Sequence, residues 1–176
     1  MASIVEDLRI TFGLRENHAN EINEWIRFPM FKKVKSFDSL TLLSLNTVDV
    51  TNDTVTLILS NCPLLETLAL KNTRSLWSLV VNGPSLKLKH LKIKHCFQLA
   101  VVEILAENLV SFKYLESLMD ISFGNVPLLS EVSQECFSLI PAEFPEFSNL
   151  KHLELNFLEI NDQSLAVLVS LLRACS

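Results

Sequence analysis

Apolar residues recur in one fixed pattern along most of the chain. Residues 40–45 read L-T-L-L-S-L, residues 65–70 read L-E-T-L-A-L, and residues 88–93 read L-K-H-L-K-I. Residues 150–155 repeat the pattern as L-K-H-L-E-L, and residues 109–114 carry the degenerate form L-V-S-F-K-Y. Apolar and polar positions alternate at the end of each segment, which is typical of a strand with one buried face. We therefore predict a short strand in each segment, with its polar side chains on the opposite face.

The spacing of these segments indicates the fold class. From Leu40 onward they begin 25, 23 and 21 residues apart, and Leu129 with Val132 marks a weaker unit 20 residues later. A further unit is expected at residues 5–12. An L-x-x-L-x-L pattern every 20 to 29 residues is the signature of a leucine-rich repeat. We predict an α/β leucine-rich-repeat solenoid, a short curved horseshoe of about six or seven units, with parallel strands on its concave face and helices or irregular arms on its convex side.

The alternative is a generic α/β domain whose strands happen to be rich in leucine. Its strand–helix–strand units would be longer and would carry more glycine at the turns than the three glycines of this chain. The regular spacing favours the repeat fold.

Three segments have the apolar spacing of an amphipathic helix. The first covers residues 19–28, the second ends at Cys62 before Pro63, and the third covers residues 165–175. Asn52 or Asp53 is expected to cap the second helix. The outer two helices are expected to cap the ends of the solenoid only partly, so we predict modest stability or self-association.

Composition and charge narrow the function classes. The chain has 176 residues, is 49% hydrophobic and carries a net charge of −5, which argues against a nucleic-acid-binding protein. No apolar run approaches the roughly 18 residues needed to cross a bilayer, so no membrane association is expected. The N-terminus lacks the features of a signal peptide. Four widely spaced cysteines then favour reduced thiols in an intracellular protein, cytoplasmic or nuclear.

The candidate partner-binding residues are the polar ones that alternate with the buried leucines and so share the concave face. They are Glu66, Thr67, Lys71, Lys89, His90, Lys92, Lys94, Lys113, Lys151, His152 and Glu154. The basic strip at residues 89–94 could hold an acidic peptide or an inositol phosphate. The alternative is that these lysines only solvate the strand and prevent pairing with neighbouring sheets.

No catalytic or metal site is expected. His90 and His95 have opposite strand parity, so they should point to different faces. Cys96 falls at the buried consensus position, where it should bond the turn backbone. The sequence has neither a phosphate-binding glycine-rich loop nor a glycine-rich elbow around a serine. We therefore expect no enzyme activity, no metal and no cofactor.

The aromatic residues are expected mainly in the core. Trp25, Trp77 and Phe112 look like core or inter-repeat packing. A second candidate partner surface would exist if the aromatic cluster of the Pro-containing segment were exposed. That cluster consists of Phe137, Phe144 and Phe147.

The chain resembles plant F-box/LRR proteins, often of the F-box/FBD/LRR type. The resemblance is carried by residues 48–55, 59–68 and 82–93, and by residues 149–155, which are similar to the start of an FBD segment. It implies a repeat region over residues 1–148 and a last repeat over residues 149–176 that continues the same solenoid. It also implies the substrate receptor of an SCF ubiquitin ligase.

One part of that family pattern is not found. An F-box is a helical segment normally near the N-terminus, but this chain starts with a repeat-like strand. The SCF adaptor is therefore expected as a partner only if an F-box is supplied elsewhere. The alternative is a stand-alone LRR scaffold or a truncated paralogue with no ubiquitin-ligase role.

Overall fold

The computed structural model describes residues 5–11, 39–83, 85–115, 120–136, 147–157, 168–169 and 172–174. The predicted helix at residues 19–28 lies outside these ranges. The described elements are β1 (Asp7–Thr11), β2 (Leu42–Asn46), α2 (Asn52–Asn61), β3 (Thr67–Lys71), β4 (Ser78–Asn82), β5 (His90–Lys94), β6 (Val101–Leu105), β7 (Ser111–Leu115), β8 (Asp120–Phe123), β9 (Glu131–Cys136) and β10 (His152–Phe157).

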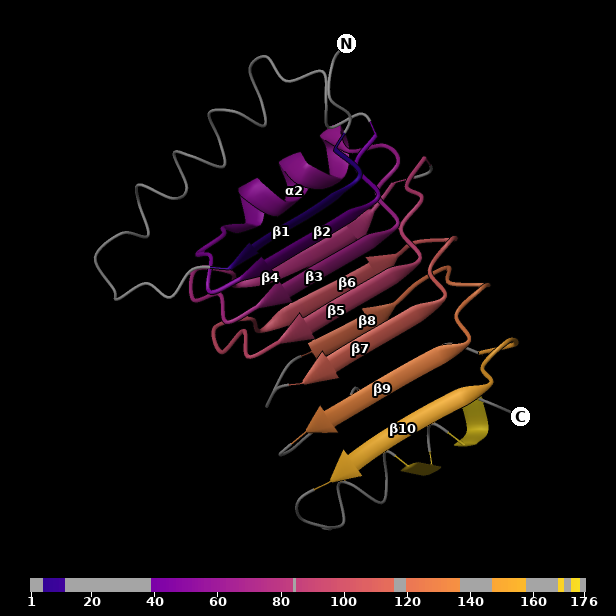
Figure 1. Cartoon of the computed structure of the whole chain (residues 1–176). Coiled ribbons are helices and arrows are strands. Elements are labelled where there is room, and N and C mark those ends of the chain that lie inside the picture. The colour runs from indigo at the N-terminus through magenta and orange to yellow at the C-terminus, as the bar shows by residue number, and fades with distance from the viewer. Residues whose placement is uncertain are drawn as a thin grey trace.

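Seven strands form one parallel sheet in the order β1-β2-β3-β5-β7-β9-β10 (Figure 1). Each repeat contributes one strand, and the second leucine of the pattern occupies the same position of every strand. The aligned residues are Leu8, Leu43, Leu68, Leu91, Phe112, Val132 and Leu153. This register confirms the predicted solenoid of stacked repeats with parallel strands, including the weak unit at Leu129 and Val132.

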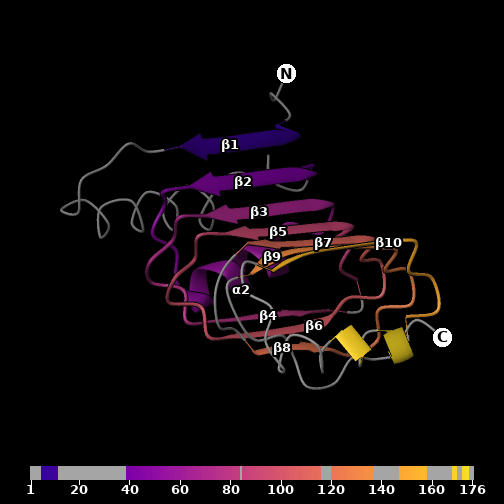
Figure 2. The ribbon, with the colours of Figure 1, turned by 90° about the horizontal axis from the view of Figure 1, so that it is seen from below.

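A second parallel sheet lies behind the first and consists of β4, β6 and β8 (Figure 2). We call it the rear sheet. Val102 of β6 aligns with Leu79 of β4 and Ile121 of β8. The prediction of helices or irregular arms on this side is wrong for these three repeats. A five-residue strand covers about the same length as a ten-residue helix, so short repeats can close with a strand.

The core fills the space between the two sheets. Leu68 and Leu91 of the seven-stranded sheet and Val102 of the rear sheet are fully buried. Burial of whole leucine and valine side chains contributes roughly 1.5–3 kcal/mol each. Because every repeat adds its leucines to the same layer, the core is continuous along the solenoid.

The aromatic predictions have mixed outcomes. Phe112 is buried as predicted, and its ring meets Phe123 edge-on at 5.6 Å between centroids. Phe123 meets Phe147 in the same way at 5.5 Å. Phe147 is only 6% exposed, so it does not belong to an exposed aromatic surface. Trp77 was expected in the core but is 60% exposed, because it precedes β4 where the chain enters the outer layer.

The other aromatic residues of these predictions, Trp25, Phe137 and Phe144, lie outside the described residues.

Helix α2 is present where the pattern predicts a helix, but its cap differs from the prediction. The N-cap is Thr51, whose side-chain oxygen accepts a hydrogen bond from the Thr54 N–H at 3.4 Å. Asn52 and Asp53 lie inside the first turn. The Asn52 side chain is instead used to hold the start of β4, which lies beside α2.

Two cysteines are buried at the ends of elements, where the chain turns. Cys62 at the end of α2 and Cys96 after β5 are buried, and neither is in a disulfide. The Cys96 thiol donates to the Lys94 carbonyl at 3.5 Å and to the Leu70 carbonyl at 3.8 Å, which confirms its predicted role in the turn.

Residues 168–169 and 172–174, within the third predicted helix, are helical. No described helix is long and apolar enough to cross a membrane.

Candidate protein-interaction face

The polar side of the seven-stranded sheet is the face that the repeat pattern assigns to the concave side, and we call it the front face. Figure 2 shows α2 and the rear sheet together on the opposite side. Parallel pairing arranges the side chains of the front face in three rows that run across β2 to β10. Row 1 contains Leu42, Thr67, His90, Ser111, Glu131 and His152. Row 2 contains Ser44, Ala69, Lys92, Lys113, Ser133 and Glu154. The register of row 3 is Asn46, Lys71, Lys94, Leu115, Glu135 and Asn156.

Three exposed lysines lie together in rows 2 and 3, and we call Lys71, Lys92 and Lys94 the lysine cluster. Lys71 and Lys94 are direct partners on the neighbouring strands β3 and β5, and Lys92 lies two residues before Lys94 on the same face. Among the described residues, none of the three forms an ion pair. The cluster is therefore a positive region that the carboxylates of the described residues leave without an ion pair.

Other predicted binding residues are already engaged with each other. Lys89 and Glu66 form an ion pair at 2.7 Å where β3 and β5 begin. The hydrogen bond from Lys89 lowers the pKa of Glu66 below its usual value. Both side chains are substantially exposed, so this pair contributes little to stability.

Lys113 of β7 is also paired, with Glu131, which is not among the predicted binding residues. Its ammonium group lies 2.6 Å from the carboxylate of Glu131 on β9, which also accepts a hydrogen bond from the Ser111 hydroxyl at 2.7 Å. These two hydrogen bonds, chiefly the one from Lys113, lower the pKa of Glu131. The weak leucine pattern of β9 concealed Glu131, but counting 20 residues on from Ser111 would have located it.

The candidates on β10 and directly before it lie apart from the lysine cluster. Strands β7 and β9 separate β5 from β10, so Lys151, His152 and Glu154 form a second polar region. Glu154 accepts hydrogen bonds from the Ser133 hydroxyl at 3.0 Å and from the Asn156 amide at 3.4 Å. Among the predicted residues, the structure therefore places the lysine cluster on β3 and β5 and a hydrogen-bonded carboxylate, Glu154, on β10.

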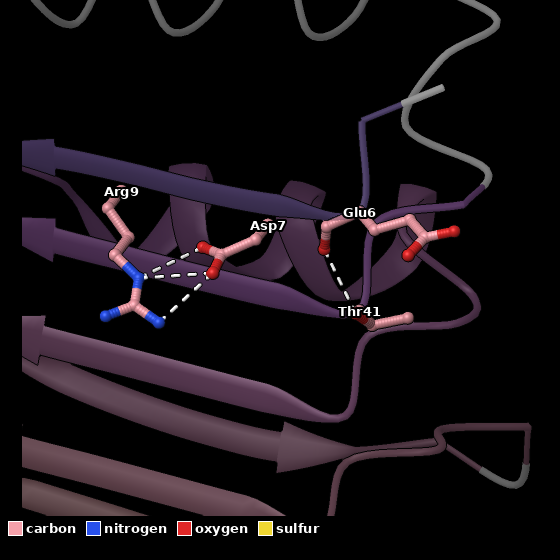
Figure 3. Close-up of polar contacts among 4 residues, drawn as sticks. All are labelled: Glu6, Asp7, Arg9 and Thr41. Atoms are coloured by element: carbon pink, nitrogen blue, oxygen red, sulfur yellow. Dashed lines mark hydrogen bonds and ion pairs between the residues drawn. The ribbon is translucent and has the colours of Figure 1, made fainter. Parts of the chain in front are cut away.

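At the other end of the sheet, β1 carries one charge of each sign. Arg9 and Asp7 form an ion pair at 3.1 Å on the same strand (Figure 3). Beside them, the Thr41 hydroxyl donates to the Glu6 carbonyl at 3.0 Å and joins the start of β2 to the chain before β1. The charges of β1 therefore compensate each other, in contrast to those of β3 and β5.

The described residues also include possible metal ligands and line a pocket. They contain no group of three His, Cys, Asp or Glu side chains that could hold a metal ion. His90 lies in row 1, whereas His95 lies in the turn after β5 and stacks on Phe97. A shallow pocket of about 190 Å³ lies near the end of α2, and none of its lining residues is titratable. They are Leu59, Ser60, Pro63, Asn82, Gly83, Ser85 and Leu86.

Comparison with known proteins identifies the repeat region. Neither the curated proteins nor the solved structures give a match. The family model described as the At1g61320/AtMIF1 LRR domain, from a plant LRR protein, matches residues 24–142. This match identifies leucine-rich repeats and does not identify an F-box or FBD protein. Because it spans more than half of the 176 residues, the chain belongs to the At1g61320/AtMIF1 LRR domain family.

Proposed function

We propose that this chain is a protein-binding module that holds its partner on the front face. The observation that carries the proposal is the row arrangement: seven parallel strands fix their backbone through buried leucines while their opposite side chains remain available. Such a surface can change its polar residues without changing the fold, because only the inward positions determine the register. Leucine-rich-repeat solenoids use extended surfaces of this kind for binding.

We further propose that the bound partner is a substrate of an SCF-type ubiquitin ligase, with this chain as the substrate-recognition region. The resemblance of residues 48–55, 59–68 and 149–155 to F-box/FBD/LRR proteins supports this assignment. The ligase adaptor would then be recruited by an F-box on another segment or another chain. The competing proposal is a stand-alone LRR scaffold without a ubiquitin role.

The module is proposed to act without catalysis, inside the cell, in the cytoplasm or nucleus. Two observations support this. Cys62 and Cys96 are buried and are not joined in a disulfide, which suits a reducing compartment. On the described front face, Lys113 and Glu131 form an ion pair and three lysines form the lysine cluster, and the pocket near α2 has no titratable lining.

Site-specific cross-linking tests the binding face. A photo-reactive phenylalanine would be placed at Ser44 or Asn156 on the front face and, as matched controls, at Glu103 or Ser122 on the rear sheet. We expect the front-face positions to give discrete adducts with a partner protein in cell extract. Adducts formed equally from the rear-sheet positions would contradict the proposed face.

Co-precipitation tests the ligase assignment. The full chain would be expressed with the SCF adaptor and cullin, and its folding would be checked by circular dichroism. Recovery of the complex would support the substrate-receptor proposal. Failure to recover it from the folded chain would favour the stand-alone scaffold.

A further inference from the structure

We propose that the lysine cluster recognises an acidic segment of the partner protein, which lies across β3 and β5. This inference rests on the proposed protein-binding function and names the chemistry of its partner. The segment carries neighbouring Asp or Glu residues opposite Lys71, Lys92 and Lys94, followed by an apolar residue.

The charge distribution is the first support. The three neighbouring strands β3, β5 and β7 read TLALK, HLKIK and SFKYL, and thus contain four lysines and no carboxylate. The whole chain has a net charge of −5, so this face is opposite in sign to the protein that carries it. Of the four lysines, only Lys113 has an ion-pair partner among the described residues. Clustered positive charge on a surface favours a ligand of negative charge.

The register is the second support. Because Lys71 and Lys94 are directly opposed, their backbones are separated by about 4.8 Å, the ordinary distance between neighbouring strands. Like charges in such a pair destabilise a sheet. A bound carboxylate between the two ammonium groups would remove this repulsion, and so would gain from an interaction that the free protein lacks.

The position of β3 and β5 excludes the alternative that their lysines protect an open sheet edge. Lysines often protect the open edge of a sheet against pairing with another chain. However, β3 pairs with β2 and β5, while β5 pairs with β3 and β7, so both strands lie in the interior. Neither has an open edge to protect. A need for solubility does not explain lysine at these positions, because acidic residues give the same solubility and are more frequent in this chain.

The neighbouring side chains favour a peptide over a small anion. In row 2, Ala69 lies next to Lys92, and Ser44 lies next to Ala69 on the other side. Both side chains are small, so the backbone of a bound peptide can approach the sheet beside the lysines. In row 3, the half-buried Leu115 lies directly beside Lys94. A free phosphate would use only the ammonium groups. A peptide would contact the ammonium groups, the small side chains of Ser44 and Ala69, and the apolar Leu115.

Binding of labelled peptides to the full chain tests this inference. The probe is a fluorescein-labelled peptide of alternating Asp and Glu with one leucine, and its matched control replaces the acids with Asn and Gln. Anisotropy would be measured at about 50 mM and about 200 mM NaCl, because salt screens exposed charges. Lys94→Gln and Lys71→Gln/Lys94→Gln would be compared with Lys87→Gln, which alters an exposed lysine just before β5.

We expect the acidic peptide to bind the wild type more tightly at low salt and the neutral peptide not to bind. Lys94→Gln removes one charged hydrogen bond, so it should weaken binding about tenfold, and the double variant should weaken it further. Lys87→Gln should change the affinity less than about threefold, as expected of a screened distant charge. Equal affinity of the wild type and the double variant would overturn the inference.

A charge reversal distinguishes recognition from folding. Lys94→Glu places a carboxylate opposite Lys71, so it should raise the urea midpoint while abolishing binding of the acidic peptide. A variant that lost binding because it unfolded would show a lower midpoint instead. If Lys94→Glu retained binding, the cluster would not be the site.

Inositol hexakisphosphate serves as the competing small anion. Displacement of the bound peptide by it at high concentration supports the shared site, whereas its binding without any peptide binding overturns the peptide assignment. If peptides fail but front-face cross-linking succeeds, only this inference falls. If front-face cross-linking also fails, the proposed function falls with it.

Discussion

Replacement of Asn52 by alanine should release α2 from the rear sheet. The Asn52 side-chain oxygen accepts hydrogen bonds from the N–H groups of Trp77 at 3.1 Å and Ser78 at 3.2 Å. Its amide nitrogen donates to the Ser78 hydroxyl at 2.7 Å. One side chain thus accepts from two consecutive backbone N–H groups, those of the residue before β4 and of the first residue of β4. Because the residues involved are 25 and 26 positions apart, the contact joins neighbouring repeats.

The size of the effect follows from these three bonds. A typical hydrogen bond contributes about 1 kcal/mol net, which gives an upper value of about 3 kcal/mol. Trp77 is exposed, so water can replace part of what its N–H loses. Ser78 is only partly exposed, and its two groups are less easily hydrated. We therefore expect Asn52→Ala to lower the free energy of unfolding by about 2 kcal/mol.

Equilibrium urea unfolding, followed by far-ultraviolet circular dichroism, measures this change. The matched control is Thr56→Ala on the same helix, whose exposed hydroxyl donates only to the Asn52 carbonyl at 3.0 Å. Since alanine has the higher helix propensity, the control should change stability by less than about 0.5 kcal/mol. Trp77 fluorescence in a Trp25→Phe background should report the loss at β4 directly.

Asn52→Asp is the sharper variant. A carboxylate keeps both acceptor bonds, can accept from the Ser78 hydroxyl instead of donating to it, and is favoured in the first turn of a helix. It should therefore be nearly as stable as the wild type at pH 7. Its pKa would be lowered in the folded chain, so stability would fall as the pH drops below about 4. Equal losses for Asn52→Ala and Asn52→Asp at pH 7 would refute the proposed contact.

Three further substitutions test other features by the same urea measurement. Thr47 has φ of 58°, a left-handed conformation that Asn72 adopts in the next repeat, so Thr47→Asn should stabilise the chain by about 1 kcal/mol; a loss would contradict the strain. The pKa of Glu131 is lowered chiefly by its hydrogen bond from Lys113, so this pairing stabilises the fold above pH about 4.3 and is lost as the pH falls through the lowered pKa. Glu131→Gln should reduce the loss of stability between pH about 5 and 3, and an unchanged pH profile would refute this linkage. Leu91 is fully buried, so Leu91→Ala should cost about 2–5 kcal/mol, and a cost below about 1 kcal/mol would contradict its burial.

The seven-stranded sheet could be predicted because its physical causes are local in sequence. Leucines with a period of two define which face is buried, and a shift of one residue would turn Leu68 and Leu91 to solvent. The register of each strand with its neighbour follows from that pattern alone. Even the degenerate segment with Phe112 and Tyr114 keeps both side chains buried.

The candidate face was predictable only in part. Strand parity places Lys71, Lys92 and Lys94 on the front face, as expected, but it does not show which charges are paired. Pairing depends on contacts between repeats, such as that of Lys113 with Glu131 from the weakest repeat. The use of Asn52 was also hidden, because the local pattern fits a helix cap equally well, and only the nearby start of β4 decides between the two roles.

The rear sheet shows which information the leucine pattern alone does not use. Helix α2 has ten residues and, at about 1.5 Å per residue, covers about 15 Å. The five residues of β4 cover about 16 Å at about 3.3 Å per residue. A strand therefore crosses the rear of a repeat with about five fewer residues than a helix needs. The repeat that contains α2 is 25 residues long, and those that follow shorten to 23, 21 and 20 as β4, β6 and β8 replace the helix. Repeat length, read together with the leucine positions, thus determines whether the second layer is helical or extended.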